Sequence, residues 1–120
     1  CKNLNKINIS NKVVILEKGV FSGCENLNEI TIPYGVINIG DGAFEECKSL
    51  REVSIPDSVA SIGDYAFWNC QSLNQITVWS NVTSIGYSAF DGCKNLTIRA
   101  FKGSYAERYA LENEIPFEEI

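Results

Sequence analysis

The 120-residue chain contains neither histidine nor methionine. Without histidine it cannot form a Ser-His-Asp triad, a Cys-His dyad or a metal site with an imidazole ligand. Without methionine it has no start residue of its own, so we expect a processed or excised piece of a longer protein. Basic residues are also scarce, 10 against 15 acidic ones, for a formal net charge of −5. No basic cluster of the kind that nucleic-acid binding requires occurs, so no nucleic-acid partner is expected.

Long hydrophobic runs are missing as well. The longest uninterrupted aliphatic run is Val13–Leu16, whereas a membrane-spanning helix needs about 18 apolar residues or more. No segment of this chain is therefore expected to insert into a membrane. Hydrophobic residues nevertheless make up 45% of the sequence and charged residues 21%, which is the composition of a folded globular domain.

The cysteines recur at a fixed interval of 23 residues. They are Cys1, Cys24, Cys47, Cys70 and Cys93. A leucine follows each cysteine by three residues, and a phenylalanine precedes all but the first by three. Further apolar columns with the same period begin at Ile7, Ile9, Val13, Leu16 and Val20. So many apolar columns at one strict period predict a solenoid with one coil per repeat.

Each coil divides into three short stretches. Residues 29–32 alternate polar and apolar side chains, which predicts a short strand with one buried face. Pro33 and Pro56 end the strand because proline cannot donate to a ladder. Successive coils are expected to stack these strands in parallel, about 4.8 Å apart. The Val-x-x-Ile-Gly stretch predicts a second extended segment. The Ala-Phe-x-x-Cys stretch predicts a turn of helix or 3₁₀ helix, with its phenylalanines stacked along the core.

The complete coil reads L-x-x-I-x-I-P-x-x-V-x-x-I-G-x-x-A-F-x-x-C. This pattern resembles the BspA-like leucine-rich repeat, also called the Treponema pallidum type, which is found mainly in bacterial surface proteins. The resemblance covers residues 1 to about 98; the first coil departs most, with Ser10 in the proline column and Glu17 in the glycine column. It implies an α/β leucine-rich repeat solenoid, right-handed and β-rich, with about four 23-residue coils.

The repeat pattern breaks after Leu96. Arg99 and Phe101 stand in columns where isoleucine or valine is expected, so we expect the register to fail here. The remaining residues resemble the usual C-terminal cap of the same family. We therefore expect a solenoid over residues 1–100 and a cap over residues 101–120.

The cap is expected to contain one helix. Ser104 and Glu107 form a capping box, which predicts a helix over about 104–113. A short extended segment, Ile115–Phe117, follows it. The apolar face of the helix would close the last coil, as terminal repeats must for solubility. The chain opens in mid-coil at Cys1, so we expect upstream coils to have been removed.

The cysteine column has two interpretations. Thiolates from neighbouring coils could hold a metal, or each cysteine is a small buried hydrophobe in a ladder. We favour the second and predict that all the thiols are free, buried and unmetalled. Disulfides between coils are disfavoured because side chains in register point in parallel, which keeps their Cβ atoms farther apart than a disulfide prefers. An odd number of cysteines also leaves one unpaired.

Two further features have alternative readings. Asp41 and Asp64 share a column, with Glu45 and Glu46 nearby, and could bind calcium. We favour ordinary polar turns, because this column continues as a tyrosine. Trp68 and Trp79 stand in columns that are otherwise polar or strand-ending. Each could anchor a partner or pack against a neighbouring coil or the cap. We favour packing for Trp68 and leave both readings open for Trp79.

No catalytic set is recognisable, because the sequence lacks a paired nucleophile and base and has no phosphate-binding loop. We predict a non-enzymatic protein without a cofactor or metal. The resemblance implies an extracellular or cell-surface module that adheres to host or bacterial surface proteins. Carbohydrate is an alternative partner, because exposed aromatic residues can also anchor a sugar. A passive spacer or stalk that carries another domain is the alternative function.

The outward columns of the strands form the candidate binding face, because stacked strands present them side by side. Trp79 lies next to them and is the nearest aromatic anchor. The candidate residues are Glu29, Thr31, Glu52, Ser54, Gln75, Thr77 and Trp79.

Overall fold

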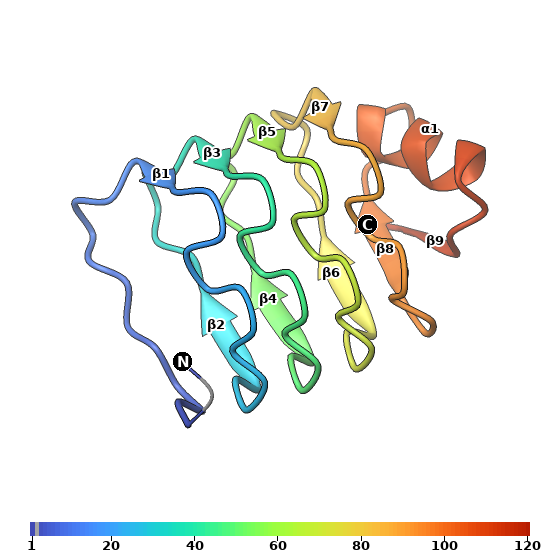
Figure 1. Ribbon diagram of the computed structural model, residues 1–120. Coiled ribbons are helices and arrows are strands. Elements are labelled where there is room, and N and C mark those ends of the chain that lie inside the picture. Colours follow the sequence, from blue (N-terminus) through green and yellow to red (C-terminus); the bar gives the residue numbers. More distant parts are fainter. Residues whose placement is uncertain (2) are drawn as a thin grey trace.

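Two stacks of short parallel strands run along the solenoid (Figure 1). The computed structural model describes residue 1 and residues 3–120. One sheet contains, in spatial order, β2 (Glu29–Thr31), β4 (Glu52–Ser54), β6 (Gln75–Thr77), β8 (Thr97–Ala100) and β9 (Phe117–Glu119). The other contains β1 (Ile15–Leu16), β3 (Asn38–Ile39), β5 (Ser61–Ile62) and β7 (Ser84–Ile85). The predicted parallel-strand solenoid is confirmed.

The strands of the larger sheet turn their central residues into the core. Ile30 pairs with Val53, and Val53 with Ile76, so that these side chains form one buried column. The two residues that flank each central residue point outward, as the alternation in the sequence predicts. Burying an aliphatic side chain contributes about 1.5–3 kcal/mol. Stacking therefore stabilises strands that are too short to be stable alone.

The phenylalanine column forms a continuous stack through the core, which confirms the expectation from the sequence. The ring centroids are 5.4 Å apart for Phe21 and Phe44, 5.1 Å for Phe44 and Phe67, and 5.3 Å for Phe67 and Phe90. Tyr109 of the C-terminal helix ends the stack, with its ring edge-on to Phe90 at 6.1 Å. The C-terminal helix therefore continues the packing of the repeats.

The Ala-Phe-x-x-Cys stretch consists of successive hydrogen-bonded turns and not of a continuous 3₁₀ helix. The Ala43 N–H donates to Gly40 of its own coil at 3.2 Å, whereas the Phe44 N–H donates to Ala66 of the next coil at 2.8 Å. This alternation continues as far as Cys47. A 3₁₀ helix needs consecutive bonds to the third residue back. Here every second N–H instead connects neighbouring coils.

The register does not fail in the last coil, contrary to the expectation from Arg99. The coil is one residue shorter, so Ile98 pairs with Ile76, and Arg99 with Thr77. Ile98 and Ala100 are fully buried in place of the residues that the strict period would have put there. The single-residue shift restores the alternation of buried and exposed side chains.

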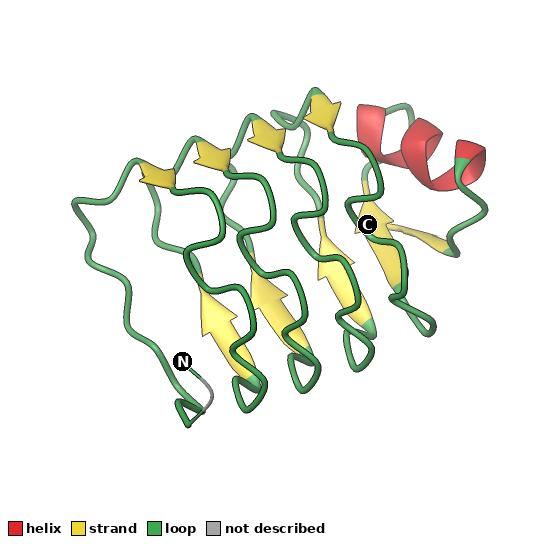
Figure 2. Cartoon of the chain, viewed as in Figure 1, coloured by secondary structure: helices red, strands yellow, loops and turns green. Residues whose placement is uncertain are grey.

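The helix expected over 104–113 is present as α1 (Tyr105–Glu112). The Ser104 hydroxyl accepts a hydrogen bond from the Glu107 N–H at 3.2 Å, and Ala106 and Ala110 are buried. The extended segment that follows begins later than expected: β9 covers Phe117–Glu119 and pairs in parallel with β8. Helix and strand together cover the end of the last coil (Figure 2).

Candidate partner-binding site

The candidate residues lie on the outward face of β2, β4 and β6. Glu29, Glu52 and Gln75 are in register in one column, and Thr31 and Ser54 are in register in the next. All five are exposed, whereas Thr77 and Trp79 are half-buried. The structure therefore brings the candidate residues other than Trp79 together as two parallel rows. We call these rows the strand face (Glu29, Thr31, Glu52, Ser54, Gln75 and Thr77).

Arg99 and Glu118 extend the second row, a feature that the strict period missed. Arg99 is in register with Thr77, and Glu118 with Arg99. The Arg99 Nε donates to Glu118 Oε1 at 2.8 Å. Because both side chains are substantially exposed, this ion pair contributes little to stability. Allowing a one-residue shift after Leu96 would have found Arg99 from the alternation of Ile98 and Ala100.

Trp79 packs against the solenoid and stays partly accessible. Its indole Nε1 donates to the Ile55 carbonyl of the preceding coil at 2.7 Å. Its ring lies 6.1 Å from that of Phe101, whose side chain is exposed. Packing against a neighbouring coil therefore describes Trp79, and its role as a partner anchor stays a prediction. The hydrogen bond holds the indole in a fixed orientation beside the strand face.

The N-terminal end of the strand face is hollowed and carries charge. A hollow of about 410 Å³ is lined by residues of the first coil and of β2 and β4, among them Lys6, Glu29 and Glu52. Glu29 and Glu52 are direct neighbours in register. Like charges opposite one another in adjacent strands are unfavourable, and a cationic group placed here would relieve the repulsion.

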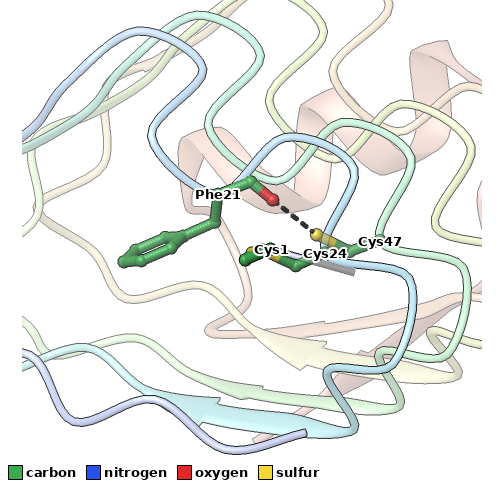
Figure 3. The surroundings of a disulfide bond; sticks show 4 residues. All are labelled: Cys1, Phe21, Cys24 and Cys47. Atoms are coloured by element: carbon green, nitrogen blue, oxygen red, sulfur yellow. Dashed lines mark hydrogen bonds between the residues drawn. A yellow bond between two sulfur atoms is a disulfide. The ribbon is translucent and has the colours of Figure 1, made fainter. Parts of the chain in front are cut away.

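One prediction about the cysteines was wrong. Cys1 and Cys24 form a disulfide, and their Cα atoms are 4.9 Å apart (Figure 3). This separation lies within the range that disulfides span. The argument from parallel side chains therefore does not hold at the first coil, where Cys1 is exposed and not packed in the column. Cys93, at the other end of the column, is only half-buried.

The free thiols each donate to a phenylalanine carbonyl of the preceding coil at 3.1–3.2 Å. The pairs are Cys47 with Phe21, Cys70 with Phe44, and Cys93 with Phe67. Burial raises the pKa of Cys47 to about 11. The adjacent Cys93 thiol and burial both raise the pKa of Cys70. Because the thiolate is the reactive form, this column is suited to packing and not to nucleophilic chemistry.

The aspartate column is occupied with backbone hydrogen bonds. Asp41 Oδ1 accepts from the Asp64 N–H at 2.8 Å, and Asp64 Oδ1 accepts from the Tyr87 N–H at 2.8 Å. The polar-turn reading accounts for both carboxylates. Within residue 1 and residues 3–120, no three or more acidic, cysteine or histidine side chains are grouped so that they could hold a metal ion. Trp68 is half-buried, with its ring edge-on to Tyr65 of its own coil at 6.4 Å.

These features define a leucine-rich repeat solenoid with an exposed, regular strand face. Residues 1–115 match the family model described as "BspA type Leucine rich repeat region (6 copies)". The chain therefore belongs to the BspA-type leucine-rich repeat family, as the repeat pattern predicted. No curated protein sequence matches it significantly. Over the part of the chain described, no helix has the length and apolar character needed to cross a membrane.

Three solved bacterial structures are similar. A leucine-rich repeat protein from Bacteroides ovatus is 35% identical, with a TM-score of 0.86. The match covers 100% of this chain and 31% of the B. ovatus chain. A leucine rich cell surface protein from Faecalibacterium prausnitzii is 42% identical, with a TM-score of 0.67. The match covers 70% of this chain and 22% of the F. prausnitzii chain. The T. pallidum leucine rich repeat protein is 23% identical and shares the fold, with a TM-score of 0.63. The match covers 79% of this chain and 58% of the T. pallidum chain. The chain thus spans less than two thirds of each.

Proposed function

We propose that the chain is a non-enzymatic protein-interaction module of a bacterial cell-surface or secreted leucine-rich repeat protein, and that the strand face with Trp79 binds the partner. The observation that carries the proposal is the register of β2, β4 and β6, which aligns exposed side chains in two uninterrupted rows. The similarity to a leucine rich cell surface protein supports the location. Adhesion to a host or bacterial surface protein is the activity that follows, with carbohydrate as the alternative ligand.

Trp79 is the proposed anchor of the interface. Binding energy concentrates in a few residues, among which tryptophan is enriched. The Ile55 hydrogen bond already fixes the indole, so little side-chain entropy is lost when a partner covers it. The neighbouring Phe101 ring enlarges the apolar area available to the partner.

The size of the strand face limits its affinity. Even with β8, which carries Arg99, the four strands are about 4.8 Å apart and about 12 Å long and give on the order of 240 Å². A standard interface buries about 800 Å² on each partner. This chain alone is therefore expected to bind weakly. The solved relatives are longer, and further coils of such an array would supply additional area.

Affinity capture with charge and anchor variants tests the proposal. Biotinylated chain is incubated with solubilised bacterial and host-cell surface proteins, and quantitative mass spectrometry compares what each variant retains. Proteins held by the native chain should be lost with Trp79→Ala and with Glu52→Lys. Glu112→Lys is the matched control, because it makes the same charge change at an exposed position on α1. Retention that is equal for all variants would show that the strand face is not the site and would favour the spacer function.

A further inference from the structure

A second hollow lies just after the strands of the smaller sheet, on a part of the coil that contributes no residue to the strand face. Its volume is about 180 Å³, and it extends across the first three coils. Two adjacent columns of the repeat form most of its lining. One column is Lys18, Asp41 and Asp64, and the next is Gly19, Gly42 and Tyr65.

The hollow exists because of the order of residues in the second column. Gly19 and Gly42 have φ angles of +64° and +61° and carry no side chain, and the Glu45 carboxylate lies over Gly42, 3.3 Å from where a Cβ would stand. The third member of the column is Tyr65, which has a similar φ of +57°. Bulky residues rarely adopt this left-handed conformation. Such strained residues cluster at functional sites, so an aromatic side chain at this position calls for an explanation.

Tyr65 is held firmly and remains accessible. Its ring is edge-on to Tyr87 at 5.7 Å and to Trp68 at 6.4 Å. The residue is nevertheless 39% exposed. An aromatic ring fixed by its neighbours and open to solvent is preorganised for contact with a ligand.

The charge around the hollow is predominantly negative. Asp41, Asp64 and Glu45 contribute three carboxylates, against the single ammonium of Lys18. The backbone hydrogen bonds that Asp41 and Asp64 accept through Oδ1 hold these two carboxylates in place. The net charge of the chain, −5, reinforces the local potential.

We propose that this hollow binds a cationic side chain, an arginine or a lysine, presented by an extended segment of a partner protein. A guanidinium or ammonium group is attracted to the face of a tyrosine ring and forms charge-assisted hydrogen bonds with carboxylates. Gly19, whose Cβ position has no neighbouring atom closer than 4.0 Å, leaves room for the aliphatic stem. The module would thus have a second contact surface, separate from the strand face and independent of it.

An NMR titration of the intact chain tests this proposal. The probe is an acetylated and amidated hexapeptide with one arginine among glycines. The matched control peptide has citrulline in place of arginine, which keeps the shape and removes the charge. A cello-oligosaccharide serves as the carbohydrate probe. Saturable shifts of the Gly19, Gly42 and Tyr65 amides with the arginine peptide are expected, at a Kd on the order of 1 mM, and they should weaken as salt is added.

Three variants make the test specific. Tyr65→Gly installs the residue that the preceding coils carry at this backbone conformation, so it should fold, and it should weaken arginine binding about fivefold. Glu45→Gln should weaken it about threefold. Tyr34→Ala removes an exposed tyrosine that does not line the hollow and should leave binding unchanged. Equal shifts with citrulline, no saturable shift with arginine, or preferential binding of the oligosaccharide would each overturn the proposal.

Discussion

The Cys70 thiol donates to the Phe44 carbonyl of the preceding coil at 3.1 Å, and the same carbonyl accepts the Cys47 N–H at 3.1 Å. One buried carbonyl therefore uses both of its acceptor positions, one within its coil and one between coils. This geometry explains why cysteine recurs at this position: it is small and apolar, and it carries a weak donor.

Cys70→Ala should lower the free energy of unfolding by about 1–3 kcal/mol, because it removes the intercoil donor and leaves a small void. Urea unfolding monitored by circular dichroism measures the change. Cys93→Ala should cost less, since Cys93 is only half-buried. A Cys70→Ala protein as stable as the native chain would show that the sulfur ladder contributes nothing.

The number of reactive thiols should depend on folding and on reduction. In the native protein, Cys47 and Cys70 are fully buried and should resist a thiol reagent at neutral pH. Unfolding without a reductant should expose the three free thiols, Cys47, Cys70 and Cys93. Unfolding with a reductant should expose all five. Five reactive thiols without reductant would contradict the Cys1–Cys24 disulfide.

Stability should fall as the pH rises above about 9. Burial raises the pKa of Cys47 from 9.0 to about 11, so between these values the unfolded chain has lost this proton and the folded chain retains it. The unfolded state then binds fewer protons, and the free energy of unfolding decreases as pH increases. Burial raises the pKa of Tyr109 to about 12, which extends the loss to higher pH. Urea midpoints from pH 8 to 11 measure the effect, which should be weaker in Cys47→Ala.

Two substitutions at left-handed positions should have opposite effects. Ser88 has φ +54°, in the same column as Gly42 at +61°. Ser88→Gly should leave stability unchanged or raise it by up to about 1 kcal/mol, because strain is relieved and chain entropy partly offsets the gain. Gly42→Ala should lower it by about 1–2 kcal/mol, and its new Cβ would also lie 3.3 Å from the Glu45 carboxylate. Equal thermal midpoints for both variants would contradict this account.

We propose that residues 101–120 act as a cap, and truncation tests this. Deleting residues 104–120 removes α1 and β9, so the edge of β8 and the end of the phenylalanine stack at Phe90 become exposed. The shortened chain should melt at a lower temperature and associate through the open strand edge. Light scattering after size-exclusion chromatography and thermal unfolding measure both effects. A truncated chain that stays monomeric with an unchanged midpoint would contradict the capping role.

The 23-residue period was sufficient to predict the features that recur in every coil. The buried column of Ile30, Val53 and Ile76 follows directly from hydrophobic spacing, and α1 follows from the Ser104 capping box. Features that depend on a departure from the period were missed. Arg99 moves onto the outward row only after a one-residue shift, which a fixed spacing cannot detect.

The remaining differences depend on three-dimensional detail. The Cys1–Cys24 disulfide depends on the path of the chain at the first coil, which the column pattern does not describe. The absence of a continuous 3₁₀ helix depends on bonds such as that from Phe44 to Ala66, which join residues of different coils. The hollow beside Tyr65 depends on the left-handed φ angles of Gly19 and Gly42, although most of its residues stand in two adjacent columns of the sequence.

The shortened last coil shows where this architecture accepts a change in chain length. One residue fewer between Leu96 and Ile98 leaves the buried residues on both sides in their usual places. The corner that leads into each strand is therefore a natural point for insertions. A loop grafted there would emerge beside the first residues of β2, β4 or β6. New specificity could arise at the rim of the strand face while the stacked core stays unaltered.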